Sequence, residues 1–292
     1  MSGESRRAGR PMGTTRRRPA LQDTLHRISA WAVAPLFLLP LVWMLSASLR
    51  QPGLPPPRGV EWIPNPIAWS NYAEPFRLLP FGTYALNSLL VTASAVALTL
   101  ATASWAGLGL LLVPPRCRSV LVALSLVLLL IPPPALWLTR FVLFRELGLI
   151  NNWGALLVPA LGGSSPLFVL LFLWTFLRIP AALFEAARLD GAGALTLWSR
   201  ISLPSARPTL TAVAVLSFLM YWSDFVSPLL YLKSQQLYTL PVGLHQLQQL
   251  DRTNWPILLA ASVLLSAPAA LSFLWAQRHF LQDSRLGGTG EW

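Results

Sequence analysis

Few side chains in this sequence could do chemistry, and those few are scattered along the chain. The three histidines, His26, His245 and His279, lie far apart and show no zinc-type spacing. Cys117 is the only cysteine, so no disulfide can form within the chain. Lys233 is the only lysine, and no glycine-rich phosphate loop surrounds it. These residues therefore offer no constellation for metal binding, nucleophilic catalysis or nucleotide hydrolysis.

One acidic residue and two other candidate ligand-binding residues lie within apolar runs. Asp224 stands toward one end of such a run, where a carboxylate is costly and is by default a functional candidate. It could contact a hydroxylated ligand, line a cavity, pair with a basic residue of another subunit, or simply be solvated at the membrane surface. Trp222 could stack on a ligand ring or anchor the chain at the interface, and Asn87 is a weaker polar candidate. We predict a possible ligand pathway along these three residues.

The most informative pattern lies in a polar gap between two apolar runs. It reads Glu-Ala-Ala-Arg-Leu-Asp-Gly over residues 185–191, and Ile-Ser-Leu-Pro follows at 201–204 after nine residues. Ala186 and Ala187 are strong helix formers of little bulk, which suits insertion of a helix into a cleft. Gly191 permits a turn that a side chain would strain. The pattern predicts a short amphipathic helix, a glycine break and the entry into the next apolar run. We expect an apolar contact surface made by Leu183, Phe184 and Leu189.

The elements that carry these residues are long apolar runs. The chain is 54% hydrophobic and only 11% charged, whereas soluble domains are about 25% charged. Continuous apolar runs of this length predict membrane-spanning helices rather than the alternating segments of a β-barrel. We therefore predict an all-α polytopic membrane protein with six transmembrane helices. The expected spans are 28–49, 84–113, 119–139, 154–178, 208–232 and 257–278.

The basic residues predict how the chain is oriented in the membrane. Seven of the 22 lysines and arginines precede residue 28, so we expect residues 1–27 to be a disordered, Arg-rich cytoplasmic tail rather than a nucleic-acid-binding arm. Six spans from this start put both termini in the cytoplasm. Ser46-Ala47-Ser48 is like a signal-peptidase site, but the preceding run is longer than a typical signal peptide's, so residues 28–83 are expected to form a retained first span and a Pro-rich external loop.

Two clusters must interrupt helices inside the predicted spans. Pro132-Pro133-Pro134 breaks the third span, because proline lacks the backbone donor that a helix needs. A second cluster that is expected to interrupt a helix lies in the fourth span, at Gly162-Gly163-Ser164-Ser165-Pro166. Such breaks are tolerated where protein or a water-filled cavity satisfies the freed backbone groups. They could line a pathway or merely mark a helix end or a close helix contact.

The pattern at 185–204 resembles the EAA loop of the permease subunits of binding-protein-dependent ABC importers, and every fixed position of that loop is matched. The resemblance implies a type I importer fold of the MetI-like kind, with the permease core at 84–281, a cytoplasmic coupling loop at 179–207 and a cytoplasmic tail at 282–292. In that family the loop docks into a cleft of a separate ATPase. The positions implied to couple to it are Glu185, Ala186, Ala187, Leu189, Asp190, Gly191, Ile201, Leu203 and Pro204.

Further residues are similar to the carbohydrate branch of that family, in particular to the second permease of maltose-type and glycerol-phosphate-type importers. They are Asn87-Ser88-Leu89, Trp222, residues 239–244, Trp255, Ala260-Ala261 and residues 277–280. The branch commonly ends in a Gly-rich segment with a lysine close to the terminus, but residues 282–292 contain no lysine. The resemblance implies a sugar importer in the bacterial inner membrane. It also implies a partner permease, an ATPase pair that holds ATP and Mg²⁺, an external solute-binding protein, and no cofactor or metal on this non-catalytic chain.

Two other classes of protein compete with this interpretation. An ion-driven secondary transporter often has inverted repeats and buried acids at the midplane, but the sequence shows no internal repeat and Asp224 is the only evident acid in a span. A membrane-embedded enzyme would need catalytic side chains on facing helices. The histidines lie at polar edges and Cys117 is isolated. The importer interpretation is therefore favoured, and the ion-driven carrier is its main alternative.

Overall fold

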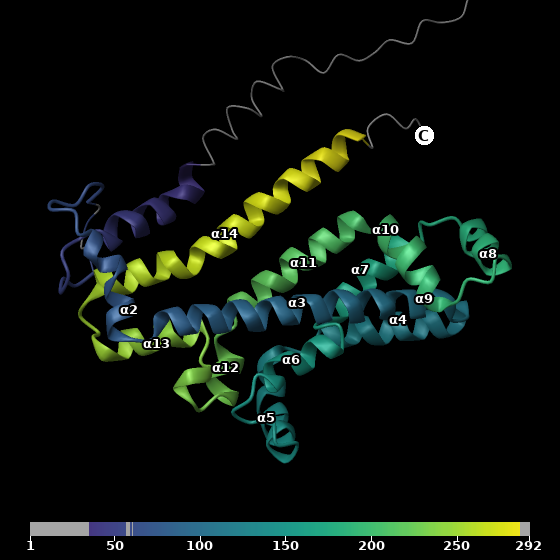
Figure 1. Ribbon diagram of the computed structural model, residues 1–292, viewed down its shortest axis with the longest axis horizontal. Helices are drawn as coiled ribbons and strands as arrows, with labels where there is room; N and C mark the ends of the chain where they lie inside the picture. Colours follow the sequence, from purple (N-terminus) through teal and green to yellow (C-terminus); the bar gives the residue numbers. More distant parts are fainter. Residues whose placement is uncertain (1–34, 57–58, 60, 287–292) are drawn as a thin grey trace, which may run out of the picture.

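The computed structural model describes residues 35–56, 59 and 61–286, and within this part the chain is helical and contains no strand. The long helices run roughly side by side, with α8 at one end of the molecule and α2 and α13 at the other (Figure 1). The helices in chain order are Pro35–Ser48, η1 (Trp69–Tyr72), α2 (Glu74–Leu78), α3 (Phe81–Leu112), α4 (Pro115–Leu129), η2 (Pro133–Leu136), α5 (Trp137–Glu146), α6 (Gly154–Leu161), α7 (Pro166–Phe176), α8 (Ala181–Leu189), α9 (Ala194–Thr196), the π-helical η3 (Leu197–Ser202), α10 (Leu203–Ser205), α11 (Arg207–Trp222), α12 (Val226–Tyr231), η4 (Gln235–Leu237), α13 (Leu240–Leu250) and α14 (Trp255–Leu286).

The structure confirms an all-α membrane fold. Within the described residues, three stretches are long and apolar enough to cross a membrane: Phe81–Leu112, Gly154–Phe176 and Trp255–Gln277. Two bent helix pairs would bring the number to five, and Pro35–Ser48 is a shorter apolar helix. The predicted tail 1–27 and the first residues of the predicted span 28–49 lie outside the described residues. The count of six crossings stays a prediction.

The helix α3 is the central element of the fold, and it packs against α6, α7 and α11. Gly107 lets α3 and α7 approach closely, because a Cβ there would lie 2.7 Å from the Cβ of Phe172. A core of buried side chains follows this contact and includes Ala103, Phe172 and Phe176. Small residues at helix contacts are the usual means of close packing in membranes, where apolar surface alone does not drive helices together.

Three of the predicted spans are interrupted in the structure. The predicted break at Pro132-Pro133-Pro134 is confirmed: α4 ends at Leu129, and the chain turns by 95° before α5. The fourth span separates into α6 and α7 around Gly163 and Ser164, which adopt positive φ angles of 79° and 60°. The prediction of one continuous helix over 208–232 for the fifth span is wrong, because α11 ends at Trp222 and α12 begins at Val226.

The segment before α3 is tied to the first helix by side-chain hydrogen bonds. Asn71 is fully buried and donates from Nδ2 to the carbonyl oxygens of Ser48 and Arg50, at 2.8 and 2.6 Å. The hydroxyl groups of Tyr72 and Ser48 lie 2.7 Å apart. The segment also forms two short helices, so it is less irregular than its prolines predict. Trp69 is exposed there.

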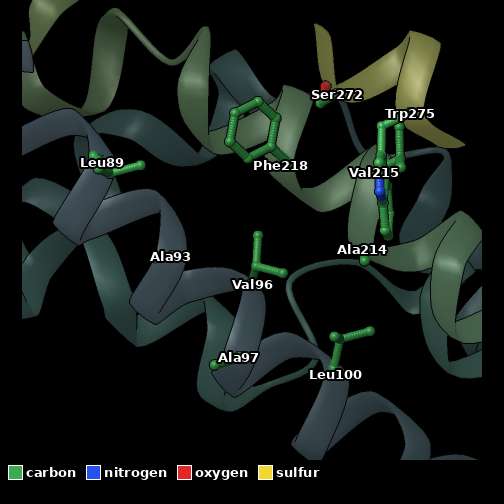
Figure 2. A pocket seen from close by; sticks show the side chains of 10 residues that line it. All are labelled: Leu89, Ala93, Val96, Ala97, Leu100, Ala214, Val215, Phe218, Ser272 and Trp275. Atoms are coloured by element: carbon green, nitrogen blue, oxygen red, sulfur yellow. The ribbon is translucent and has the colours of Figure 1, made fainter. Parts of the chain in front are cut away.

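An apolar groove is lined by residues of α3, α11 and α14 (Figure 2). Its volume is about 410 Å³, and small side chains such as Ala93, Ala97 and Ala214 leave it open. Ser272 is the only residue among its lining side chains with a polar oxygen, and its Oγ donates to the carbonyl oxygen of Ala269 in its own helix. We refer to this space as the apolar groove.

Candidate functional site

The first candidate site is α8, at one end of the molecule (Figure 1). Phe184 is buried against the core of α3 and α7, so the prediction that it belongs to an exposed contact surface is wrong. Leu183 and Leu189 are 52% and 89% exposed, and Ala186 is exposed as well. One side chain therefore fixes the helix to the core, and the opposite face presents apolar side chains to the outside.

A glycine-dependent cap ends α8. The N–H of Gly191 donates to the carbonyl of Arg188 at 3.0 Å, and the N–H of Ala192 donates to the carbonyl of Ala187 at 2.9 Å. These two bonds are the Schellman arrangement, in which the residue after the helix adopts a left-handed conformation. Gly191 has φ of 81° and open space around it. Glycine is therefore required at residue 191 by the left-handed backbone conformation, and not by a neighbouring atom that a Cβ would meet.

The second half of the loop is anchored to α3. The Trp198 indole donates from Nε1 to Ser104 Oγ at 3.0 Å and packs edge-on against Trp105. Ile201 also packs against the core, and the chain then turns by 85° between Ser205 and Arg207. Leu203 and Pro204 form the short helix before this elbow. The residues at 201–204 thus bring the loop back to the membrane helices at a fixed angle.

The charged residues of α8 face a second cavity. Glu185 and Arg188 line a space of about 460 Å³ with Arg178 and Leu112, between α8 and the ends of α3 and α7. Glu185 and Asp190 form no ion pair within the part of the chain that the structure describes. Both carboxylates are exposed. They are therefore available to a partner that binds this end of the molecule.

The second candidate site is a cavity of about 450 Å³ at the place where all three helix breaks meet. We call it the polar cavity. Asp224 lies in it, and its Oδ1 accepts from the N–H of Ser227 in the first turn of α12 at 3.1 Å. This bond gives the acid between α11 and α12 a local backbone partner. The wall of the cavity also includes Ile131, Pro133, Trp137, Arg140, Ser164, Ser165, Pro166, Met220, Tyr221 and Tyr231.

Hydroxyl groups connect the polar cavity to the middle of α3. The Ser164 and Tyr221 hydroxyl oxygens lie 2.9 Å apart, and Ser164 also bonds to the Thr99 hydroxyl. The carbonyl oxygen of Ala160, at the end of α6, accepts from the Thr102 hydroxyl at 2.6 Å and from the N–H of Gly163 at 3.0 Å. Thr99 lies near the midpoint of the 32-residue α3. The interruption at Ser164 is therefore at the depth of the membrane centre if α3 spans it.

The other two predicted pathway residues are placed in the protein interior. Asn87 is 5% exposed and donates from Nδ2 to the carbonyl oxygens of Gln236 and Tyr238, at 2.8 and 2.9 Å. Trp222 is 5% exposed, donates from Nε1 to the carbonyl oxygen of Leu265 at 2.8 Å, and stacks on Phe218. Both side chains join neighbouring elements of the core. Neither lines the polar cavity, and their role in a ligand pathway stays a prediction.

Several cavity residues were not singled out from the sequence. Arg140 lies just beyond the predicted span 119–139, and Trp137 and Tyr221 belong to no motif, yet all three line the polar cavity with Asp224. The helix-breaking clusters are the sequence feature that could have indicated these cavity residues, because interrupted spans need polar surroundings. Among the described residues, no group of three or more His, Cys, Asp or Glu side chains could hold a metal ion.

Comparison with known proteins gives the class to which this fold and these sites belong. The family described as "Binding-protein-dependent transport system inner membrane component" matches residues 100–285. The chain therefore belongs to this family of ABC importer permeases, which are multi-pass membrane subunits that transport rather than catalyse.

Individual relatives cover nearly the whole chain. The arabinooligosaccharides transport system permease protein AraQ of Halalkalibacterium halodurans is 32% identical over 88% of this chain and 92% of its own length. The trehalose/maltose transport system permease protein MalG of Thermococcus litoralis is 26% identical over 93% and 98%. A solved bacterial ABC transporter involved in the import of alginate matches with a TM-score of 0.74 and 20% identity, over 92% of this chain and 100% of that one. The structural match confirms the MetI-like fold.

Proposed function

We propose that this chain is the permease subunit of an ATP-driven, binding-protein-dependent sugar importer. In this function it forms half of the translocation pathway and couples to a separate ATPase through the loop 179–207. Its partners are a second permease, a pair of ATPase subunits that hold ATP and Mg²⁺, and an external solute-binding protein. The chain spans the bacterial inner membrane with both termini on the cytoplasmic side. The loop that carries α8 follows the fourth predicted span, so it lies on the cytoplasmic side as well.

The observation that carries the coupling role is the construction of α8. It is held to the core by Phe184 and ended by a rigid glycine cap, while Leu183 and Leu189 stay exposed. An exposed apolar face on an otherwise fixed helix favours docking into a groove of a partner protein. Because the loop is anchored at both halves, a push on α8 would move α3 and α11 rather than bend the loop.

The observation that supports a sugar substrate is the list of relatives. The curated relatives are named for arabinooligosaccharides, trehalose and maltose, and the melibiose, raffinose and stachyose group. The polar cavity is compatible with such solutes, because its hydroxyl groups, acid and arginine can all hydrogen-bond to sugar hydroxyls. Ligand pockets of about 300–1,000 Å³ are typical for small molecules.

The docking of α8 can be tested by site-directed crosslinking. In a Cys117→Ser background, Leu189→Cys should crosslink to the co-purified ATPase through a short thiol-reactive reagent that also reaches lysines. Leu250→Cys is the matched control, since Leu250 is 61% exposed but lies in α13, at the opposite end of the molecule (Figure 1). A crosslink from residue 250 but not from residue 189 would contradict the proposed orientation and coupling surface.

The glycine cap provides a functional test of coupling. Gly191→Val should lower ATP-dependent uptake roughly tenfold, because a left-handed conformation costs a residue with a Cβ about 1–2 kcal/mol and would shift α8. Gly193→Val is the control: Gly193 has extended backbone and open space around its Cα. Uptake is measured in proteoliposomes with the assembled complex. Equal uptake in both variants would argue against a requirement for this cap.

A further inference from the structure

We propose that the polar cavity is a binding subsite for a neutral oligosaccharide, with Arg140 and Asp224 as its two polar arms and Trp137 as an aromatic surface. This inference rests on the proposed sugar importer and names where this subunit would hold the sugar. The residues come from three separate interruptions of the helical bundle, so the fold and not the local sequence brings them together.

The first argument is the position of the helix breaks. Ile131 and Pro133 line the cavity from the α4–α5 break, Ser164 from the α6–α7 break, and Asp224 from the α11–α12 break. Irregular backbone at membrane depth is stable only inside protein or beside a water-filled cavity. Three breaks that meet at one polar space therefore indicate a hydrated chamber. Secondary transporters, a different class of membrane protein, likewise hold their solutes at discontinuous helices near the midplane.

The second argument is the strained turn that presents Ser164. This residue adopts φ of 60°, which is uncommon for a side chain with a Cβ. The conformation is held because its hydroxyl bonds to Thr99 and Tyr221. Strain of this kind is often kept where it serves a site. Here it places Ser164 on the cavity wall, next to Ser165, the residue that caps α7.

The third argument is the state of the two charged groups. Arg140 makes no hydrogen bond or ion pair with the residues that the structure describes, although it is half-buried. Asp224 accepts one hydrogen bond, from the backbone of Ser227, and an ionised carboxylate has further acceptor capacity. A guanidinium with free donors and a carboxylate with free acceptors complement hydroxyl groups, which both accept and donate. Such groups are costly at depth and default to function.

The balance of charge selects the class of sugar. Arg140 and Asp224 carry opposite charges, and the remaining titratable groups on the cavity wall are the tyrosines Tyr221 and Tyr231. The net charge of the wall is therefore close to zero, which favours a neutral ligand over a sugar acid. Trp137 is half-buried on the same wall and offers a flat apolar surface to the C–H face of a sugar ring.

The test uses the complete importer in proteoliposomes, with its solute-binding protein and labelled arabinotriose as the probe. Arg140→Gln and Asp224→Asn should each lower the initial uptake rate at least about tenfold, the effect expected for loss of a hydrogen bond to a charged group. Binding-protein-stimulated ATP hydrolysis should stay within about twofold of the unmodified protein, because α8 is unchanged. Asp224→Glu should recover part of the lost uptake.

The matched controls remove a charge of the same sign outside the cavity. Arg145→Gln removes an exposed arginine of α5 that pairs with Glu146, and Asp251→Asn removes an exposed acid between α13 and α14. Both should leave uptake within about twofold of the unmodified importer, as is usual for surface substitutions. The abundance of each assembled complex is measured by size-exclusion chromatography, so that a loss of protein is not taken for a loss of transport.

Three outcomes have separate meanings. Uptake by Arg140→Gln and Asp224→Asn equal to that of the controls would overturn the subsite. A double variant that transports better than either single variant would also overturn it, because the two charges would then serve only to balance each other. If the unmodified importer takes up none of arabinotriose, maltotriose and raffinose, the proposed sugar function itself fails, and the subsite with it.

Discussion

The apolar groove and the polar cavity have similar volumes, about 410 and 450 Å³, but only the polar cavity is lined by charged side chains. The groove lies between helices that are continuous where they border it, α3, α11 and α14, and Figure 2 shows mainly aliphatic and aromatic side chains around it. The polar cavity lies where helices are interrupted and contains an acid, an arginine and several hydroxyl groups. The difference indicates that helix continuity, rather than the size of a space, separates a packing gap from a site.

The physical reason lies in the hydrogen bonds of the backbone. A continuous helix satisfies its own N–H and C=O groups, so the space beside it can be lined by alanine and leucine and stay dry. An interrupted helix exposes backbone groups that need partners, and the Thr102 hydroxyl donates to one such group, the carbonyl oxygen of Ala160. Water and polar ligands can then enter at the same place.

The largest expected effect comes from placing a charge in each space. Ala97→Asp in the apolar groove should destabilise membrane insertion by about 2.5–3.5 kcal/mol, because no partner is available there. Ser165→Asp in the polar cavity should be tolerated, since Ser165 is the N-cap of α7 and aspartate caps helices well. The amount of integrated protein and its melting temperature are measured. A similar loss of integrated protein in both variants would contradict the distinction between the apolar groove and the polar cavity.

A smaller effect is expected from added bulk. Met220→Trp would narrow the polar cavity and should lower sugar uptake roughly fivefold, because a filled pocket loses contact with its ligand. Ala93→Phe in the apolar groove should change uptake less than about twofold, because the side chain fills a gap between helices. Uptake in proteoliposomes distinguishes these outcomes. A stronger loss from residue 93 would assign the transport role to the groove.

A third expected effect is on stability rather than on transport, and it concerns one serine on the wall of each space, Ser164 in the polar cavity and Ser272 in the apolar groove. Ser164→Ala should destabilise the protein by about 1–2 kcal/mol, because it loses its hydroxyl bonds and keeps the positive φ. Ser164→Gly loses the same bonds, but should recover about 1 kcal/mol through relief of the backbone. Ser272→Ala should be nearly neutral, because its hydroxyl bonds only to its own helix. Melting temperatures in mild detergent would order the three variants, and a different order would contradict this account.

The loop at α8 shows how far a local pattern can be interpreted. Its helix, its glycine turn and its return at 201–204 were predictable because each depends on residues close together in sequence. The burial of Phe184 was not, since it depends on α3 and α7. The break at residues 132–134 was predictable from proline chemistry, whereas its 95° angle depends on the surrounding helices.

The amino-acid sequence is sufficient to predict a helical membrane protein, two of its helix breaks, and the short helix, glycine turn and return at 185–204. These properties follow from apolar runs, from proline and glycine, and from the spacing at 185–204, which all act over short distances along the chain. The tertiary structure was needed to show that Arg140 lines the same cavity as Asp224, and that Asn87 and Trp222 are buried. The reason is that residues brought together from three separate breaks share no local pattern, and the long helices alone set their distance in space.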